Sequence, residues 1–220
     1  MNKKQPYKEK PYTSIVAHYE NCLRRFGDTH LGVDWQKADE ADKRYQVMLD
    51  IIQPINGPTA SLLDFGCGTA GLLDYMIRTK TQNIYYNGLD ISAYFIDVCN
   101  KKYPNTRFFT IDILDHHILL PRYDYIVLNG VFTEKIDLSH AEMTDYFKSM
   151  IVKIFPYCIK GIAFNLRSKQ VESENMALFH LSFDELALFL VKNFGRHFII
   201  RNDYELEEYT VYLYSQSSQQ

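Results

Sequence analysis

The sequence lacks several features that would assign it to a specialised class of protein. It has four cysteines in 220 residues, and no two of them form a C-x-x-C pair. Their scattered positions argue against a zinc site and against a disulfide framework, and they indicate a reduced, cytoplasmic setting. The four are Cys22, Cys67, Cys99 and Cys158.

Long apolar runs and an excess of positive charge are also missing. No run of 18 apolar residues occurs, and the polar residues 1–6 lead into further polar residues, so we expect neither a membrane span nor a signal peptide. The net charge of −3 offers no general attraction to phosphate backbones. This charge disfavours a nucleic-acid partner and fits a small or neutral substrate better.

The composition that is present is typical of one globular domain. Hydrophobic residues make up 46% of the chain, and 220 residues allow one sizeable core but hardly two. We expect residues 1–11 to be a disordered tail and residues 12–53 to form an N-terminal helical cap or lid. Residues 54–215 are expected to form the main domain.

Short apolar runs alternate with amphipathic helical patterns from Ser61 onward. The alternation predicts an α/β fold with a Rossmann-like, doubly wound sheet of seven mostly parallel strands. The last two strands, residues 197–201 and 208–214, are separated by a short polar turn, which predicts an antiparallel C-terminal hairpin. The other expected strands are residues 61–65, 84–89, 107–111, 123–128 and 161–165, and the expected helices include residues 12–26, 38–52, 70–78, 92–102 and 139–155.

The most informative segment is residues 61–71, in which an apolar strand leads into an acid and then into a glycine loop that opens a helix. Gly66 and Gly68 let the backbone turn sharply against a ligand, and the helix that follows presents free N–H groups. Read literally, the loop satisfies the G-x-G-x-x-G dinucleotide pattern, with Asp90 at the end of the next strand. Three features weigh against that interpretation: Asp64 precedes the first glycine, two helices precede the first strand, and the sheet ends in a hairpin.

The same features resemble the class I S-adenosylmethionine (SAM)-dependent methyltransferases, in which D/E-x-G-x-G-x-G marks the first strand and loop. Residues 64–70 carry this run, with Ala70 in place of the third glycine. The resemblance covers roughly residues 40–215 and implies a methyltransferase with SAM as its cofactor. Further matching segments are residues 88–92, 109–113 and 123–129 and the terminal hairpin.

The resemblance also implies a role for acids along the sheet. Asp64 would hold the methionyl amino group, Asp90 would accept from both ribose hydroxyls, and Asp112 would accept from the adenine amine. Ile91 would lie against the adenine face, and the N–H of Ile113 would reach a ring nitrogen. The remaining candidates for cofactor binding are Gly66, Cys67, Gly68 and Asn129.

Each of these assignments has a structural alternative. Asp90 would also favour the start of the helix that follows it, and Asp112 would also suit a turn. Cys67 is better explained as a small packing thiol than as a nucleophile. The sequence leaves these alternatives open.

The methyl acceptor is less well defined than the donor. Methyl transfer is an in-line displacement that needs alignment and exclusion of water, and a hydroxyl or ammonium acceptor also needs a base. The segment after the fourth strand lacks the N/D-P-P-Y/F signature of base-modifying and glutamine-modifying enzymes, and it lacks the acid of a catechol-type magnesium site, so we expect no metal. The candidate bases are His140, His180 and Glu134, and the candidate substrate-pocket residues are Tyr19, Trp35, Gly130, Phe132 and Arg167.

The sequence therefore predicts a cytoplasmic SAM-dependent methyltransferase that acts on a small-molecule acceptor at oxygen or nitrogen, such as a sugar or another metabolite. We expect a monomer or a homodimer. Two alternatives remain: an NAD(P)-dependent oxidoreductase, and a catalytically silent methyltransferase-like protein that binds the cofactor as a partner.

Overall fold

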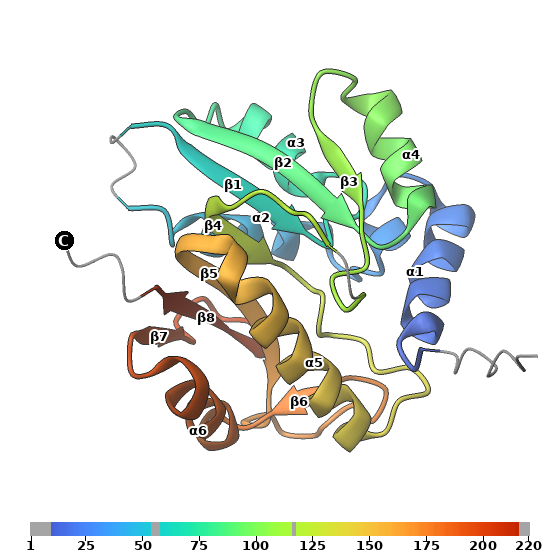
Figure 1. Cartoon of the computed structure of the whole chain (residues 1–220). Coiled ribbons are helices and arrows are strands. Elements are labelled where there is room, and N and C mark those ends of the chain that lie inside the picture. Colours follow the sequence, from blue (N-terminus) through green and yellow to red (C-terminus); the bar gives the residue numbers. More distant parts are fainter. Residues whose placement is uncertain (1–9, 54–57, 116–117, 216–220) are drawn as a thin grey trace, which may run out of the picture.

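One mixed sheet runs through the chain, as the computed structural model in Figure 1 shows for residues 10–53, 58–115 and 118–215. Its strand order is β3-β2-β1-β4-β5-β8-β7, and the short strand β6 pairs with β5. The elements in chain order are α1 (Thr13–Phe26), η1 (His30–Val33), α2 (Ala38–Leu49), β1 (Ala60–Phe65), α3 (Gly71–Arg78), β2 (Ile84–Asp90), α4 (Ala93–Lys102), β3 (Phe108–Thr110), β4 (Tyr123–Leu128), α5 (His140–Ile154), η2 (Phe155–Tyr157), β5 (Cys158–Ser168), β6 (His180–Leu181), α6 (Phe183–Phe194), β7 (Phe198–Arg201) and β8 (Glu208–Tyr214).

Strands β1 to β6 pair in parallel, whereas β8 is antiparallel to both β5 and β7. The predicted mostly parallel sheet with an antiparallel terminal hairpin is confirmed. To the seven predicted strands β6 adds an eighth, whose two residues are too few to show in the apolar pattern. The chain order reverses between β1 and β4, so the loops after these strands diverge and leave a crevice at the C-terminal edge.

Both faces of the central strands are buried. Adjacent residues show this, since successive side chains of a strand point to opposite faces of the sheet. Leu62 and Leu63 are both fully buried, yet they belong to different core clusters. Leu62 packs with side chains of α2 and α3, and Leu63 packs in the cluster that contains α5 and α6. The result is a sheet between two layers of helices.

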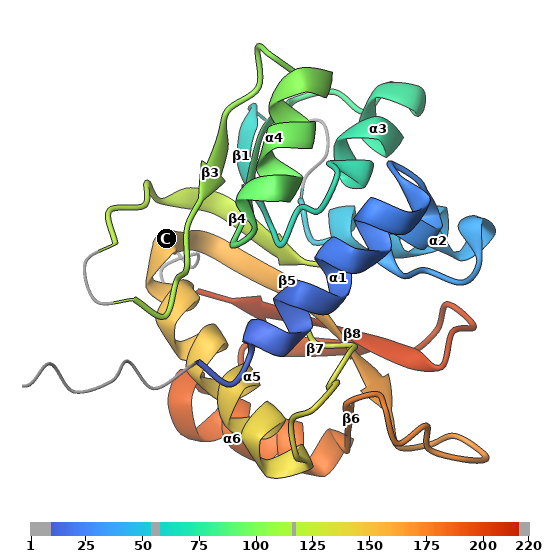
Figure 2. The same cartoon turned by 90° about the vertical axis from the view of Figure 1, so that its right-hand side faces the viewer.

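Helix α1 crosses the loops at the C-terminal edge of the sheet (Figure 2). The hydroxyl of Tyr12, the residue that precedes α1, donates to Asp112 at 2.7 Å. The hydroxyl of Tyr19 donates to the carbonyl of Gly130 at 3.4 Å. Glu20 accepts a hydrogen bond of 2.7 Å from Ser92 in the loop after β2. Helix α1 is therefore tied to three different strand ends.

Several element ends differ from the predicted ones. Helix α2 ends at Leu49 rather than at residue 52, and β3 is limited to Phe108–Thr110. Strand β5 extends over Cys158–Ser168 because it pairs with β4, β6 and β8, which the local pattern does not reveal. Within the predicted disordered tail, residues 1–9 lie outside the described part of the chain.

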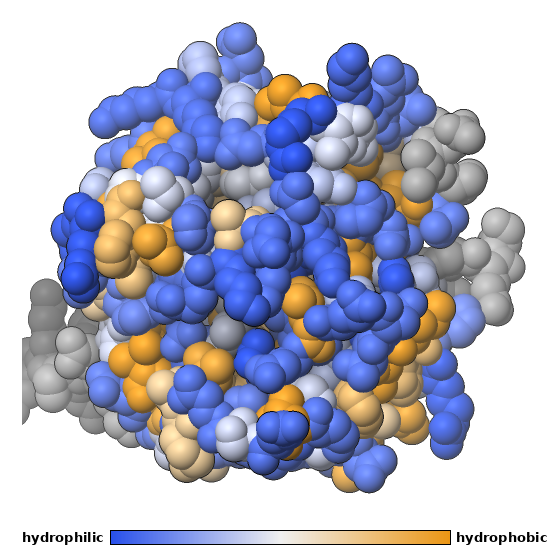
Figure 3. Space-filling view, turned by 180° about the vertical axis from the view of Figure 1, so that it is seen from behind, coloured by the Kyte–Doolittle hydropathy of each residue, from blue (hydrophilic) through white to orange (hydrophobic). Residues whose placement is uncertain are grey.

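Hydrophilic side chains cover most of the face opposite to that of Figure 1, with smaller hydrophobic areas between them (Figure 3). None of the helices in the described ranges has the length and apolar character needed to cross a membrane.

Candidate functional site

A cavity of about 940 Å³, including its opening to solvent, lies at the C-terminal edge of the sheet beneath α1. Its walls come from α1, from the segment around η1 and α2, and from the loops after β1, β2 and β4. The predicted cofactor residues that line it are Asp64, Gly66, Cys67, Gly68, Asp90, Ile91 and Asn129. The predicted substrate-pocket residues that line it are Tyr19, Trp35 and Gly130.

The glycine loop forms the floor of this cavity. Gly66 and Gly68 have φ angles of +73° and +52°, which glycine adopts without strain. A Cβ on Gly66 would lie 2.7 Å from a methyl carbon of Val131, in the loop after β4. The tight approach of the two loops therefore requires glycine at this position.

The N–H groups of the loop bind other parts of the protein. Those of Gly66 and Cys67 donate to the carbonyl of Leu89 at 2.7 and 3.0 Å, and that of Gly68 donates to the Asp90 carboxylate at 3.1 Å. The N–H of Ala70 donates to the carbonyl of Cys67 at 2.8 Å. These four N–H groups are therefore not free to bind a phosphate.

Two buried carboxylates face the cavity at the ends of neighbouring strands. Asp64 is 3% exposed and accepts a hydrogen bond of 2.7 Å from the hydroxyl of Tyr86. Burial raises the pKa of Asp64 to about 7. Burial also raises the pKa of Asp90 to about 6, although the N–H groups of Ser92 and Gly68 stabilise its charged form. Both acids thus occupy places where a cationic or hydrogen-bond-donating ligand would favour their charged forms.

The rest of the lining is apolar and aromatic. Neither lysine nor arginine is present among the described residues that line the cavity. An electron-rich ring face attracts a cation, so this lining favours a positively charged ligand over an anionic one. The aromatic lining residues are Tyr12, Tyr19, Trp35, Tyr45, Phe95 and Tyr146.

Asp112 and Ile113 lie outside the cavity lining. Burial would raise the pKa of Asp112, but hydrogen bonds from Lys10 and Tyr12 outweigh it, so the pKa lies below its ordinary value. Ile113 is 1% exposed and packs in the main core. The hydroxyl of Tyr12, which does line the cavity, thus occupies the carboxylate that the resemblance assigns to the adenine amine.

The loop after β4 forms the opposite wall. Both amide atoms of Asn129 are buried without a hydrogen-bond partner in the described structure, although the residue lines the cavity. The neighbouring Gly130 is held by Asn165, whose Oδ1 accepts the N–H of Gly130 at 2.8 Å. An unpaired amide at a cavity wall can both donate to and accept from a polar ligand.

Comparison with known proteins agrees with this geometry. Residues 63–150 match a family described as a methyltransferase domain. The chain contains a methyltransferase domain. Among curated protein sequences, none matches this chain.

Solved structures resemble the methyltransferase domain together with its N-terminal helices. Magnesium protoporphyrin IX methyltransferase from Synechocystis PCC 6803, solved with bound SAM, is 15% identical, with a TM-score of 0.63 over 96% of this chain and 100% of that chain. The DhpI–SAM–HEP complex is 14% identical, with a TM-score of 0.61 over 93% and 98% of the two chains. CalS10, an amino pentose methyltransferase from Micromonospora echinaspora, is 13% identical, with a TM-score of 0.54 over 97% and 100%. The predicted Rossmann-like fold is thereby confirmed.

The predicted histidine bases lie away from the cavity of the methyltransferase domain. His140 Nε2 bonds to the carbonyl of His180 at 2.9 Å, and His180 Nδ1 bonds to the carbonyl of Ser168 at 2.6 Å. His180 is only 2% exposed, and neither ring is part of the cavity lining. Both histidines therefore take structural positions beside β5 and β6.

Glu134 is half-buried, and burial raises its pKa, with the charge of Asp34 as the next cause. The pKa of the cavity-lining Tyr19 is raised mainly by burial, and the charge of Glu134 raises it further. Of the three candidate bases, Glu134 is thus the one with an electrostatic link to a lining residue.

Two predicted pocket residues occupy other places in the methyltransferase domain. Phe132 is fully buried and makes edge contacts with the rings of Phe147 and Phe164. Arg167 forms an ion pair of 2.7 Å with Glu207. Neither lines the cavity. Phe132 follows the cavity-lining Val131, but its ring points into the core.

A buried polar network supports the loop after β4, and the sequence analysis missed it. Arg44 Nε donates to both carboxylate oxygens of Glu208 at 3.1 and 3.0 Å, and Glu208 accepts from Asn165 Nδ2 at 3.0 Å. Asn165 in turn holds Gly130 at the cavity wall. The available signal was a glutamate, Glu208, that opens an otherwise largely apolar strand.

Replacing Asp64 by asparagine is expected to stabilise the methyltransferase domain at pH 8 by at least about 1.4 kcal/mol, the equivalent of one pKa unit. The pKa of Asp64 rises from 3.8 to about 7 on folding, so the folded state binds more protons between these values and wild-type stability falls as the pH rises through that window. Asparagine keeps an oxygen for Tyr86 but carries no charge.

Urea unfolding of both proteins at pH 4 and pH 8 measures this effect. The gain should shrink towards pH 4, where the wild-type carboxyl is protonated in the folded state and about half protonated in the unfolded state. Asp97→Asn, at an exposed position of α4, should show no such dependence. A constant difference at both pH values would contradict a buried, titrating Asp64.

Proposed function

We propose that this chain is a SAM-dependent methyltransferase that transfers a methyl group to oxygen or nitrogen of a small-molecule acceptor. The observation that carries the proposal is the charge of the cavity: two buried carboxylates, Asp64 and Asp90, stand among aromatic side chains, with no basic residue in the described lining. SAM carries a sulfonium and an α-amino group, a ribose diol and no phosphate, so it matches such a lining.

Each part of SAM has a suitable partner among the lining residues. Asp90 provides carboxylate oxygens for the ribose hydroxyls, and Asp64 provides a negative charge for the methionyl amino group. The aromatic rings provide electron-rich faces for the sulfonium. The hydroxyl of Tyr12 donates to the Asp112 carboxylate at 2.7 Å. Tyr12 would have to release this carboxylate before Asp112, together with Ile113, could bind the adenine.

Bound SAM supplies an electrophilic methyl group, so the protein mainly has to align the acceptor and exclude water. Asn129 offers an unpaired amide for orienting a polar acceptor, and Tyr19 and Trp35 form the apolar wall beside it. Glu134 is the preferred acceptor of the released proton, since burial raises its pKa above the ordinary value and its charge acts on the cavity-lining Tyr19. Helix α1 covers the cavity and limits the entry of water.

The nature of the acceptor follows from the cavity rather than from the fold. Similar structures include a magnesium protoporphyrin IX methyltransferase and an amino pentose methyltransferase, so this fold accommodates very different molecules. Without lysine or arginine in its described lining, the cavity favours a neutral acceptor such as a sugar over an anionic one. The four free cysteines support a reducing, cytoplasmic setting, and we expect a monomer or a homodimer.

The oxidoreductase alternative receives little support from the same residues. A dinucleotide brings a pyrophosphate, which needs free N–H groups at the glycine loop and a positive field. The N–H groups of Gly66, Cys67 and Gly68 are already bonded within the protein, and the nearby charges of Asp64 and Asp90 would repel the phosphates.

Titration calorimetry with SAM, S-adenosylhomocysteine, NADH and NADPH tests the proposal. We expect binding of the first two ligands only, followed by release of S-adenosylhomocysteine when neutral hydroxylated and aminated acceptors are supplied. Tight binding of NADH without binding of SAM would overturn the assignment. Binding of SAM without transfer to any acceptor would favour the catalytically silent alternative.

A further inference from the structure

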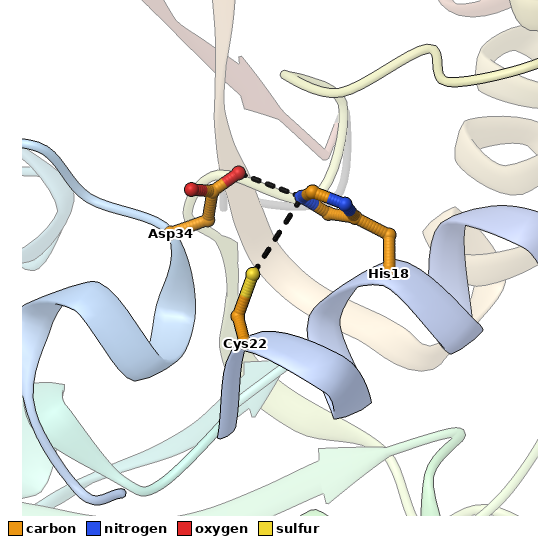
Figure 4. Close-up of side chains that lie close together, drawn as sticks. All are labelled: His18, Cys22 and Asp34. Carbon is orange, nitrogen blue, oxygen red and sulfur yellow. Dashed lines mark hydrogen bonds and ion pairs between the residues drawn. The ribbon is translucent and has the colours of Figure 1, made fainter. Parts of the chain in front are cut away.

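Three side chains with metal-binding atoms converge beside the cavity, outside the donor site (Figure 4). His18 and Cys22 come from α1, and Asp34 comes from the segment that follows η1. Their ligand atoms, one from each residue, all lie within 4.8 Å of one another. His18 Nε2 lies 2.7 Å from Asp34 Oδ2 and 3.8 Å from Cys22 Sγ.

Local structure explains why the three side chains meet. Residues four apart share one face of a helix, so His18 and Cys22 project in the same direction. Asp34 has a left-handed backbone with φ 57°, and its N–H caps η1 by donating to the carbonyls of His30 and Leu31. This turn directs Asp34 towards α1, whereas its neighbours Val33 and Trp35 line the cavity.

The spacing of the three atoms is close to that of a zinc site. With zinc bonds of about 2.1 Å to nitrogen and oxygen and about 2.3 Å to sulfur, tetrahedral ligands lie roughly 3.4 Å apart for N and O and roughly 3.6 Å apart for N and S. The observed N···S distance of 3.8 Å is near the second value. The hydrogen-bonded N···O pair at 2.7 Å would have to open by less than 1 Å.

The chemistry of the donors favours the same ion. Imidazole nitrogen, thiolate sulfur and carboxylate oxygen together suit zinc, whereas calcium and magnesium prefer oxygen ligands alone. Three protein ligands leave the fourth tetrahedral position open, which is the arrangement of catalytic rather than structural zinc sites. Asp34 and Glu134 add negative charge in the neighbourhood of His18, which favours a cation there.

We propose that His18, Cys22 and Asp34 bind one zinc ion, with water in the fourth position, beside the cavity. Such an ion would cross-link α1 and the segment after η1, both of which contribute to the cavity walls. This site was not predicted from the sequence, because its donors do not form a known spacing motif. They meet only when α1 folds against the following segment.

Metal binding to the full-length protein, after treatment with a chelator, tests the proposal. Titration with Zn²⁺ against a chromophoric competitor should show one high-affinity equivalent, and Co²⁺ should give a thiolate-to-cobalt charge-transfer absorption. Cys22→Ser and His18→Ala should each weaken zinc binding by about 100-fold or more, and Cys22→Ser should abolish the cobalt absorption.

Two matched variants serve as controls. Cys158→Ala removes a buried thiol from β5, and His30→Ala removes an imidazole from η1. Both variants should still bind one equivalent of Zn²⁺. Absence of a bound equivalent in wild type, or an equivalent that Cys22→Ser and His18→Ala leave unchanged, would overturn the zinc site. SAM binding by the same samples separates this result from the proposed function, because the donor is assigned to Asp64 and Asp90.

Discussion

Replacing Asp90 by alanine is expected to weaken SAM binding by about 1.5–3 kcal/mol, or roughly 10- to 150-fold. Asp90 ends β2 and places a buried carboxylate in the cavity wall, where two ribose hydroxyls would donate to it. Alanine removes both acceptor oxygens, so the ribose hydroxyls would be buried without hydrogen-bond partners. Titration calorimetry with SAM at pH 7.5 measures the loss.

The control for this variant is Asp97→Ala, which removes a carboxylate from the exposed side of α4 and should bind SAM like wild type. Asp90→Asn provides a second test, because it keeps the size of the side chain and can still accept the N–H of Ser92. We expect it to lose part of the affinity. If folded Asp90→Ala binds SAM as tightly as wild type, the ribose role of Asp90 is wrong.

Replacing Glu208 by alanine is expected to lower the free energy of unfolding by about 3–5 kcal/mol. The carboxylate is 4% exposed and binds the guanidinium of Arg44, which is 10% exposed. Its removal leaves Arg44 with Glu40 as its remaining carboxylate partner and takes the acceptor from Asn165 Nδ2. Urea unfolding measures the loss.

The neighbouring Glu207 offers a matched control. It also forms an ion pair, with Arg167, but its side chain is 70% exposed, so Glu207→Ala should cost about 0–1 kcal/mol. The double variant Arg44→Met/Glu208→Leu should recover part of the loss, because apolar pairs of similar volume avoid the desolvation of buried charges. Equal, small effects of Glu207→Ala and Glu208→Ala would show that the buried network contributes little to stability.

The presence of Asp64 and Asp90 at the cavity could be predicted because these residues lie at strand ends. Asp64 and Asp90 each terminate or nearly terminate a buried parallel strand, and such ends meet at one edge of the sheet. Asp112 also follows a strand, yet its carboxylate is taken by Tyr12, which is 100 residues away in sequence. A contact of that separation leaves no local pattern.

The acceptor side was harder to predict for the same reason. The positions of His140 and His180 depend on how the long segment after β5 folds back to form β6. That segment places the carbonyl of His180 against the ring of His140, and neither ring lines the cavity. Arg44 and Glu208 are 164 residues apart and meet where α2 lies beside the first residue of β8. Side chains of this kind are located by tertiary packing, which spacing along the chain does not encode.

The three hydrogen bonds that tie α1 to the loops after β2, β3 and β4 have a kinetic consequence. If the cavity holds a methyl donor as proposed, these bonds restrain the helix that lies over it. Variants that break them would then exchange the donor faster than the wild-type protein.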